Sequence, residues 1–376
     1  MARMEKRHTL AWGRHDPDYS RNRILRQAFQ DLGWTVSDFR PRLSSLGDLE
    51  AACRGVPRPD LVWLPSFRQR DAAAARRWCR RRKVPLMFDP LISAYDKQVF
   101  ERCKYAPGSA QAEQIRRREA RQFGAADLLL ADTRSHADFF AETFGVPPDR
   151  IRVVPVGAEE PLFGPAADGL ANRADAPFEV LFYGSFIPLH GAATIAQAAC
   201  QYVGPPVRWH FLGGGPARAV CEKIAAGRPD VVFEDWNPYR ERPKSIWQSD
   251  LVLGVFGTTP KAERVIANKV FQALACGRPV LSRTSRAYPE GAEASGGLIL
   301  IPPGDPGALA RAVAALARDR AGMPARNRAA RALFEAHFSR AKIAAALGAA
   351  LAGLFQGYDS SGGWKVAGGS ESPPSL

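Results

Sequence analysis

The sequence lacks any pair of cysteines in a CxxC arrangement, and it lacks an apolar run long enough to cross a membrane. Its six cysteines are spread along the chain, a pattern typical of thiols buried in a reducing compartment rather than of a disulfide or zinc framework. Residues 1–10 are basic and have no apolar core of the kind that a signal peptide needs. The longest apolar stretch, Ile343 to Phe355, falls short of the roughly 20 residues that span a bilayer, and its spacing predicts a packed terminal helix. We therefore expect a cytoplasmic protein, either free or resting on the inner face of a membrane.

The charge is strongly unbalanced toward the basic side. Lys and Arg number 52 against 38 Asp and Glu, which leaves a net charge of +14. Basic runs lie at residues 76–77, 80–83 and 116–118. Such faces attract phosphate, nucleic acid or an anionic membrane, although an ordinary solvated helix face has the same composition. No RRM, KH or zinc-finger pattern accompanies the charge, so we do not expect nucleic acid as a partner.

Length and composition indicate a globular protein of two domains. The 376 residues exceed the size at which one hydrophobic core stops growing, and 46% hydrophobic with 24% charged residues is an ordinary globular composition. A stretch without periodicity, 159–177, is rich in alanine, proline and glycine and is interpreted as the linker between domains 1–158 and 178–356. The Gly-, Ser- and Pro-rich tail, 357–376, is expected to be disordered.

Short apolar runs alternate with helical stretches through both halves, which is typical of parallel strands joined by crossover helices. Strands are expected at 9–12, 35–36, 61–64, 85–88, 128–130 and 151–156, and then at 180–183, 207–212, 231–233, 251–255, 279–281 and 298–301. Helices are expected, among others, over 22–32, 136–144, 306–317 and 341–355. The fold class is therefore α/β, with two Rossmann-like doubly wound domains whose ligands bind beyond the carboxyl ends of the strands, in the cleft between them.

Two glycine-containing loops follow strands of the second half. The first runs from Gly184 to Gly191 and contains Ser185 and His190; the second contains the triplet Gly213, Gly214 and Gly215. Glycine lets the backbone approach a ligand closely, and a helix N-terminus favours an anion such as phosphate. A plain strand-to-helix turn has the same composition, so each loop alone leaves both interpretations open.

A third segment combines a cation with a helix start. Asn268 is a suitable N-cap for a helix that ends before Gly277. Helical spacing places Lys269 and Gln272 on one face of its first turn. A cation and an amide at the positive end of a helix suit a diphosphate and a ribose, whereas an exposed lysine near a cap has no such role.

The spaced set of motifs resembles a known family. The chain contains LFYGSFIPLHG, FLGGGP, VVFEDWNPY, SDLVLGVFG, NKVFQALACGRPVL and LILIPPGDPGALARAV, in that order. This order is similar to that of the retaining family-4 (group 1) glycosyltransferases, which have G-R-x4-K-G, then G-x-G-P, then E-x7-E before A-x-G-x-P-V. The resemblance covers residues 178–355 well and is vaguer before them. It implies the GT-B fold, with a C-terminal helix that packs back.

The chain departs from the family at four charged positions. The resemblance places the family's arginine and lysine at Ser185 and His190, and its two glutamates at Arg264 and Gln272. Gln272 can still hydrogen-bond a donor ribose, and His190 can donate to a phosphate oxygen, most strongly when protonated. We infer that the positive charge for a diphosphate has moved to Lys261, Arg264 and Lys269.

Candidate residues follow from the strand ends and the resemblance together. The catalytic candidates are Asp89, His190, Arg264 and Lys269. The donor-binding candidates are Gly184, Ser185, Gly213, Gly214, Gly215, Trp236, Phe256, Gly257, Asn268 and Gln272. The acceptor-side candidates are Gly13, Arg14, Arg21 and Asn22. Asp89 is interpreted either as a residue that positions the acceptor hydroxyl or acts as a base, or as a cap of the next turn.

The resemblance implies a retaining glycosyltransferase that moves a sugar from a nucleotide-sugar donor to a glycan, lipid-linked or small-molecule acceptor, in cell-envelope or polysaccharide biosynthesis. The nucleotide-sugar is a substrate, so we expect no cofactor. The resemblance also implies no metal, since enzymes with the GT-B fold generally need none for their chemistry. The Asp16-Pro17-Asp18 sequence suits a turn better than a metal site. Two alternatives stay open: a nucleotide-sugar epimerase on the same fold, and a non-catalytic nucleotide-sugar-binding module.

Overall fold

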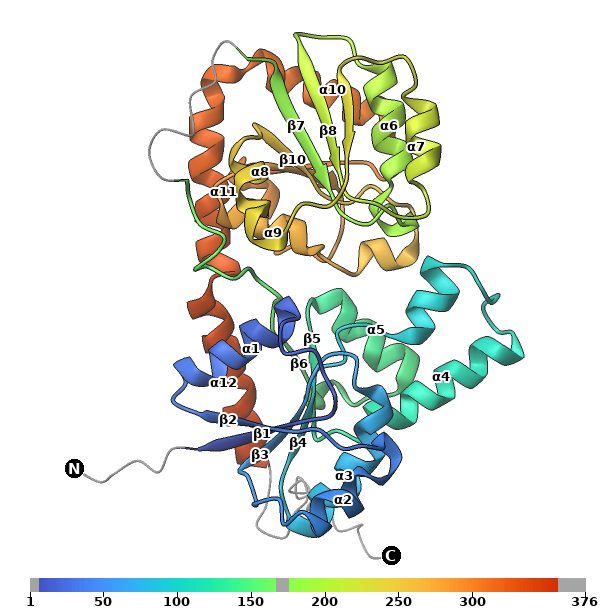
Figure 1. Ribbon diagram of the computed structural model, residues 1–376, viewed down its shortest axis with the longest axis vertical. Helices are drawn as coiled ribbons and strands as arrows, with labels where there is room; N and C mark the ends of the chain where they lie inside the picture. Colours follow the sequence, from blue (N-terminus) through green and yellow to red (C-terminus); the bar gives the residue numbers. More distant parts are fainter. Residues whose placement is uncertain (1–6, 167–175, 358–376) are drawn as a thin grey trace, which may run out of the picture.

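The computed structural model describes residues 7–166 and 176–357, which form two α/β lobes stacked one above the other (Figure 1). Each lobe is built on a six-stranded sheet, in the order β2-β1-β3-β4-β5-β6 and β12-β11-β10-β7-β8-β9, and each strand pairs with its neighbours in parallel. The prediction of two doubly wound domains is confirmed. The tail 358–376 and the linker residues 167–175 lie outside the described residues, so their predicted character is not addressed.

The lower lobe contains the first half of the chain. Its strands are β1 (His8–Trp12), β2 (Thr35–Phe39), β3 (Leu61–Leu64), β4 (Leu86–Phe88), β5 (Leu128–Ala131) and β6 (Ile151–Val153). Its helices are α1 (Ser20–Asp31), α2 (Gly47–Cys53), α3 (Ala72–Arg82), α4 (Ala110–Phe123) and α5 (Arg134–Phe144), with a short π-helix, η3 (Asp96–Glu101).

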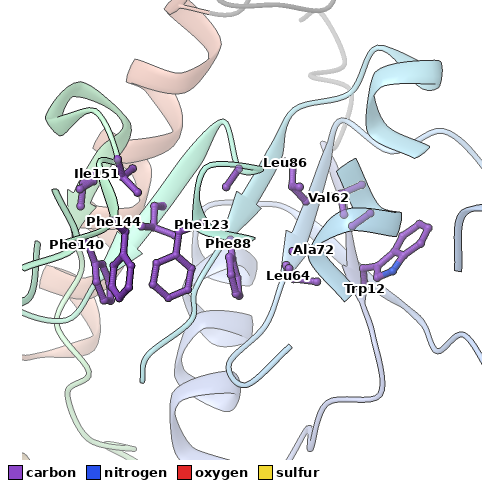
Figure 2. Close-up of a cluster of buried hydrophobic side chains, with 14 of the residues drawn as sticks. Trp12, Val62, Leu64, Ala72, Leu86, Phe88, Phe123, Phe140, Phe144 and Ile151 are labelled. Atoms are coloured by element: carbon purple, nitrogen blue, oxygen red, sulfur yellow. The ribbon is translucent and has the colours of Figure 1, made fainter. Parts of the chain in front are cut away.

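Helices cover both faces of the lower sheet, which explains why its central strands are continuous apolar runs. Every residue of β3 is buried, as expected of a parallel strand with helices on both sides. Figure 2 shows Val62 and Leu64 on the face that also carries Phe88 and Phe123. The alternate residue Trp63 belongs to the core on the opposite face.

The upper lobe contains the second half. Its strands are β7 (Phe178–Tyr183), β8 (Val207–Leu212), β9 (Val231–Glu234), β10 (Leu251–Leu253), β11 (Val280–Arg283) and β12 (Leu298–Ile301). Its helices are α6 (Ala192–Gln201), α7 (Arg218–Ile224), α8 (Arg242–Trp247), α9 (Asn268–Ala275), α10 (Pro306–Arg318) and α11 (Met323–His337), with the short 3-10 helices η5 (Pro188–His190), η6 (Tyr239–Glu241) and η7 (Pro260–Glu263). Helices α6 and α10 pack on one face of the sheet, and α9 and α11 pack on the other.

The last helix, α12 (Arg340–Gly357), returns to the lower lobe, where it lies beside α1 (Figure 1). Its buried residues Ile343, Leu347 and Leu351 share one core with Leu25 and Phe29 of α1. The predicted packed terminal helix is confirmed. By length and composition, Arg320–Gly357 is also apolar enough to cross a membrane, but burial against the N-terminal core accounts for the apolar side of α12.

Two local expectations need correction. Of the six cysteines, Cys79, Cys221 and Cys276 are buried, but Cys53, Cys103 and Cys200 are exposed, because they lie at helix ends and in a loop at the surface. The predicted linker is also more than a spacer within its described part. Phe163 is fully buried in the upper core, and Trp247 Nε1 donates to the Gly164 carbonyl at 2.8 Å.

Candidate active site

A cavity of about 420 Å³ lies where the carboxyl ends of the upper strands face the lower lobe. Both lobes line it: Tyr19, Ile92 and Asp132 come from below, and the loops after β7 and β9 together with the start of α9 come from above. Predicted residues along it are Gly184, Ser185, His190, Trp236, Asn268, Lys269 and Gln272. The structure therefore brings together these residues from three separate sequence motifs.

The loop after β7 is shaped around Gly184. Its φ is +150°, and a Cβ there would lie 2.9 Å from Lys269 Nζ and 3.0 Å from His190 Cε1. Only glycine therefore lets both side chains meet the loop. The His190 Nδ1 donates to the Ser185 carbonyl and closes the loop. Burial, together with the charge of Lys269, lowers the pKa of His190 to about 3. His190 is thus a neutral imidazole near pH 7, and not the protonated form that would donate most strongly to a phosphate.

Lys269 occupies the first turn of α9 but is not the exposed lysine that the sequence suggested. It is only 4% exposed, and its Nζ lies 4.0 Å from the centroid of the Phe182 ring. Among the described residues, Nζ has no hydrogen-bond partner. Burial holds the pKa of this amine well below its ordinary value. The site thus contains a buried amino group that a bound anion would satisfy.

The helix α9 begins one residue differently from the prediction. Ala267 is its N-cap, with extended backbone, and Asn268 is already helical. The Asn268 side chain is therefore free to line the cavity rather than to cap. At the other end, Gly277 has a φ of +69°, as predicted for the residue after the helix.

Gln272 is held by two tyrosines. Tyr183 donates its hydroxyl to Gln272 Oε1 at 2.9 Å, and Gln272 Nε2 donates to the Tyr239 hydroxyl at 3.2 Å. Tyr239 in turn donates to Glu159 of the linker, which accepts from Arg23 of α1. Burial raises the pKa of both tyrosines, so they remain neutral donors. The amide is thus the centre of a network that reaches from the upper lobe to the lower one.

Two of the three cations proposed for the diphosphate are already paired. Lys261 forms an ion pair with Glu101, and Arg264 forms one with Asp96, both across the interface to η3. The Arg264 guanidinium also lies 4.3 Å from the centroid of the Phe139 ring. These cations therefore join the two lobes, and of the three only Lys269 lacks a partner among the described residues.

The predicted residues of the lower lobe lie outside the cavity. Arg21 donates to both oxygens of Asp89, at 3.0 and 3.1 Å, and both side chains are at most 1% exposed. Ser66 also donates to Asp89, at 3.1 Å, and its N–H donates to Asn22 at 3.2 Å. The structure thus places Asp89 in a buried ion pair that ties the strand ends together, instead of on the cleft wall where a base would stand.

Several predicted loop residues pack against other loops and do not line the cavity. Gly13 lies against Arg68 and Asp71, and the Arg14 carbonyl accepts from Arg68 at 2.7 Å. Gly213 packs on the Gly184 carbonyl and on Trp236, and Gly215 packs on Phe186. Phe256 and Gly257 pack on the Pro188–Gly191 turn. A Cβ at Gly214 would meet nothing within 4 Å. Close packing between loops, rather than contact with a ligand, explains most of these glycines.

The sequence interpretation missed Arg242, Tyr239 and Tyr19 as cavity-lining residues. The stretch Trp236-Asn237-Pro238-Tyr239-Arg240, which precedes α8, carried the available signal, since two aromatic residues and a basic one lie there shortly after a strand. Within residues 7–166 and 176–357, no group of three or more His, Cys, Asp or Glu side chains could hold a metal ion.

Two family models match the chain: "Glycosyl transferase 4-like domain" over residues 10–157 and "Glycosyl transferases group 1" over residues 177–319. The chain belongs to the group 1 glycosyltransferases. A D-inositol 3-phosphate glycosyltransferase from Acidothermus cellulolyticus is 36% identical over 108 residues, 26% of this chain and 24% of the relative. The "MMP alpha-(1->4)-mannosyltransferase" of Mycolicibacterium hassiacum is 24% identical over 248 residues, 65% of this chain and 52% of the relative. The chain thus matches only from a quarter to half of the length of these curated relatives.

Two solved structures share the fold over nearly the whole chain. Anabaena HepE in complex with UDP has a TM-score of 0.67 at 16% identity and covers 92% of this chain and 99% of its own. The sucrose-phosphate synthase of Thermosynechococcus elongatus has a TM-score of 0.68 at 20% identity and covers 93% and 100%. The predicted GT-B fold of this group 1 glycosyltransferase is confirmed.

Proposed function

We propose that this group 1 glycosyltransferase transfers a sugar, with retention, from a nucleotide-sugar donor bound in the cavity between the lobes. The observation that carries the proposal is the Lys269 amino group, which is buried, lacks a partner among the described residues and lies against the Gly184 loop. The acceptor is proposed to be a glycan, a lipid-linked sugar or a small molecule that enters from the lower lobe, in cell-envelope or polysaccharide biosynthesis.

The chemistry requires stabilisation of a departing diphosphate. As the bond between the anomeric carbon and the diphosphate breaks, negative charge grows on the leaving oxygen, and the acceptor oxygen attacks on the same face. Lys269 and the N-terminus of α9 together supply a positive field beside the cavity. A phosphate beside Lys269 would raise the pKa of the amine again and keep it protonated. HepE has been crystallised with UDP and with UDP-glucose, which supports a uridine donor as the first to test.

Incubation with radiolabelled UDP- and GDP-sugars tests the proposal, with Lys269→Met as the matched inactive variant. Transfer, or hydrolysis of the donor, that depends on Lys269 is the expected result. Binding without turnover would instead favour a non-catalytic nucleotide-sugar-binding module. Three candidate residues support that second possibility because they already form ion pairs. Asp89 pairs with Arg21, and Lys261 and Arg264 pair with η3 across the lobe interface.

We also propose that the protein is cytoplasmic and touches an anionic membrane through its lower lobe. Ion pairs with Asp127, Asp48 and Glu113 neutralise part of the basic runs. Exposed basic residues remain on these runs at Arg80, Arg82, Lys83 and Arg118. Each basic residue near an anionic surface contributes about 1 kcal/mol. Cosedimentation should therefore be stronger with anionic than with neutral vesicles, and equal binding to both would contradict the idea.

A further inference from the structure

Arg242 is a second cation on the cavity wall. It is the first residue of α8, and its guanidinium carbon lies 4.9 Å from the centroid of the Trp236 ring, 5.1 Å from Tyr239 and 5.8 Å from Tyr183. The faces of three aromatic rings therefore surround one positive charge. Such contacts attract a cation and hold a planar guanidinium in one orientation.

No acidic side chain of the described residues forms an ion pair with Arg242, in contrast to Lys261 and Arg264. Its Nε is buried and lacks a hydrogen-bond partner there. Burial also lowers the pKa of the guanidinium, although arginine keeps its charge in proteins. The half-buried guanidinium loses part of its hydration, and the rings offset only part of that loss, so a bound anion would stabilise the charge.

The end of β7 lies between Arg242 and Lys269. Tyr183 presents its ring to Arg242, and the next residue, Gly184, contacts the Lys269 amine. The Tyr183 hydroxyl also lies 3.3 Å from the Lys269 carbonyl oxygen, so the same side chain contacts both residues. A dianionic group that lies over the end of this strand would therefore have one cation on each side.

We propose that Arg242 binds the phosphate oxygens of the donor's diphosphate from the side opposite to Lys269. This inference rests on the proposed function and names the residue that supplies the charge absent at Ser185 and His190. The neutral amide of Gln272 fits this arrangement. A glutamate there would hold its carboxylate between the same two tyrosines that support Arg242, and it would compete with the phosphate for the guanidinium.

The test is calorimetric titration of Arg242→Ala with UDP, with GDP and with the corresponding nucleosides. Loss of a charge-assisted hydrogen bond should weaken diphosphate binding by about tenfold to hundredfold, while nucleoside binding changes little. Arg240→Ala is the matched control, because Arg240 is exposed, two residues away and outside this cavity. Arg242→Lys restores the charge without the planar fork and should recover only part of the affinity. Thermal unfolding without ligand shows whether each variant is folded.

The outcomes separate this inference from the proposed function. If the parent protein binds neither diphosphate, the proposed function fails and the role of Arg242 fails with it. If the parent binds and Arg242→Ala binds equally well, only the role of Arg242 is overturned. An equal loss for diphosphate and nucleoside would also overturn it, because Arg242 would then merely support the aromatic rings.

Discussion

Replacing Lys269 with methionine should strengthen the ligand-free fold and weaken nucleotide binding, two effects of opposite sign. Methionine keeps an unbranched chain against Phe182 and removes an amine that is 4% exposed and has no partner among the described residues. A buried donor without a partner costs about 1–3 kcal/mol, so the free energy of unfolding should rise within that range. For a domain of about 150–250 residues, each kcal/mol raises the Tm by about 2–4 °C.

Binding should change in the other direction, because a charge-assisted hydrogen bond of about 1.5–3 kcal/mol to phosphate is lost. Titration with UDP or GDP should therefore show an affinity lower by about tenfold to hundredfold. Lys223→Met, which removes an exposed lysine of α7, is the control, and both quantities should stay within about 0.5 kcal/mol of the parent.

Proton linkage gives a further signature of Lys269. Burial lowers the pKa of its amine in the free protein, and a bound phosphate would raise it. Binding should therefore take up a proton, and affinity should fall as the pH rises above the free-state pKa of Lys269. Calorimetry in buffers of different ionisation enthalpy measures this uptake. A Lys269→Met variant that unfolds more easily and binds UDP and GDP like the parent would refute the donor-site assignment.

Other side chains give predictions that are independent of Lys269. Arg264→Ala should lower the free energy of unfolding by about 3–5 kcal/mol in urea titrations, because the Asp96 carboxylate stays buried without its partner; the double variant with Asp96→Asn should recover most of this loss, and a full loss in both would contradict the ion pair. The pKa of His190 is lowered to about 3, so the unfolded chain takes up a proton below about pH 6.5 that the folded chain does not, and stability falls as the pH drops from about 6.5 toward 3. His190→Gln should flatten this fall in unfolding curves at pH 7 and 5, and identical slopes would count against it. Gln272→Glu should weaken diphosphate binding at least about tenfold, because the new carboxylate would pair with Arg242. Unchanged affinity by calorimetry would contradict the proximity of residue 272 to Arg242.

Strands were predictable because their burial is encoded locally. All the expected apolar runs, from Thr9–Trp12 to Leu298–Ile301, overlap observed strands. For the central strands the reason is that a strand covered on both faces needs an uninterrupted apolar sequence. The terminal helix was predictable for the same reason. Its partner, α1, was not, because an apolar stripe does not state which of two domains it will cover.

The site was predictable where it depends on one segment and not where it depends on how the lobes meet. Lys269 and Gly184 follow from a helix start and a strand end. The ion pairs of Lys261 and Arg264 join residues 160 and 168 positions apart, and no local pattern reveals such pairing. Arg242 escaped notice for a related reason, since the rings around it gather from β7, η6 and the loop after β9.

The return of α12 to the lower lobe has a consequence for biosynthesis. When the first 158 residues leave the ribosome, the surface of α1 that carries Leu25 and Phe29 has no cover, because Ile343, Leu347 and Leu351 are translated much later. The N-terminal domain therefore cannot complete its core during translation, although domains generally fold as units in order of synthesis. The core of the lower lobe is completed only after α12 has been synthesised and has packed against α1. A nascent or truncated chain that stops before residue 340 should expose this face to chaperones and aggregate.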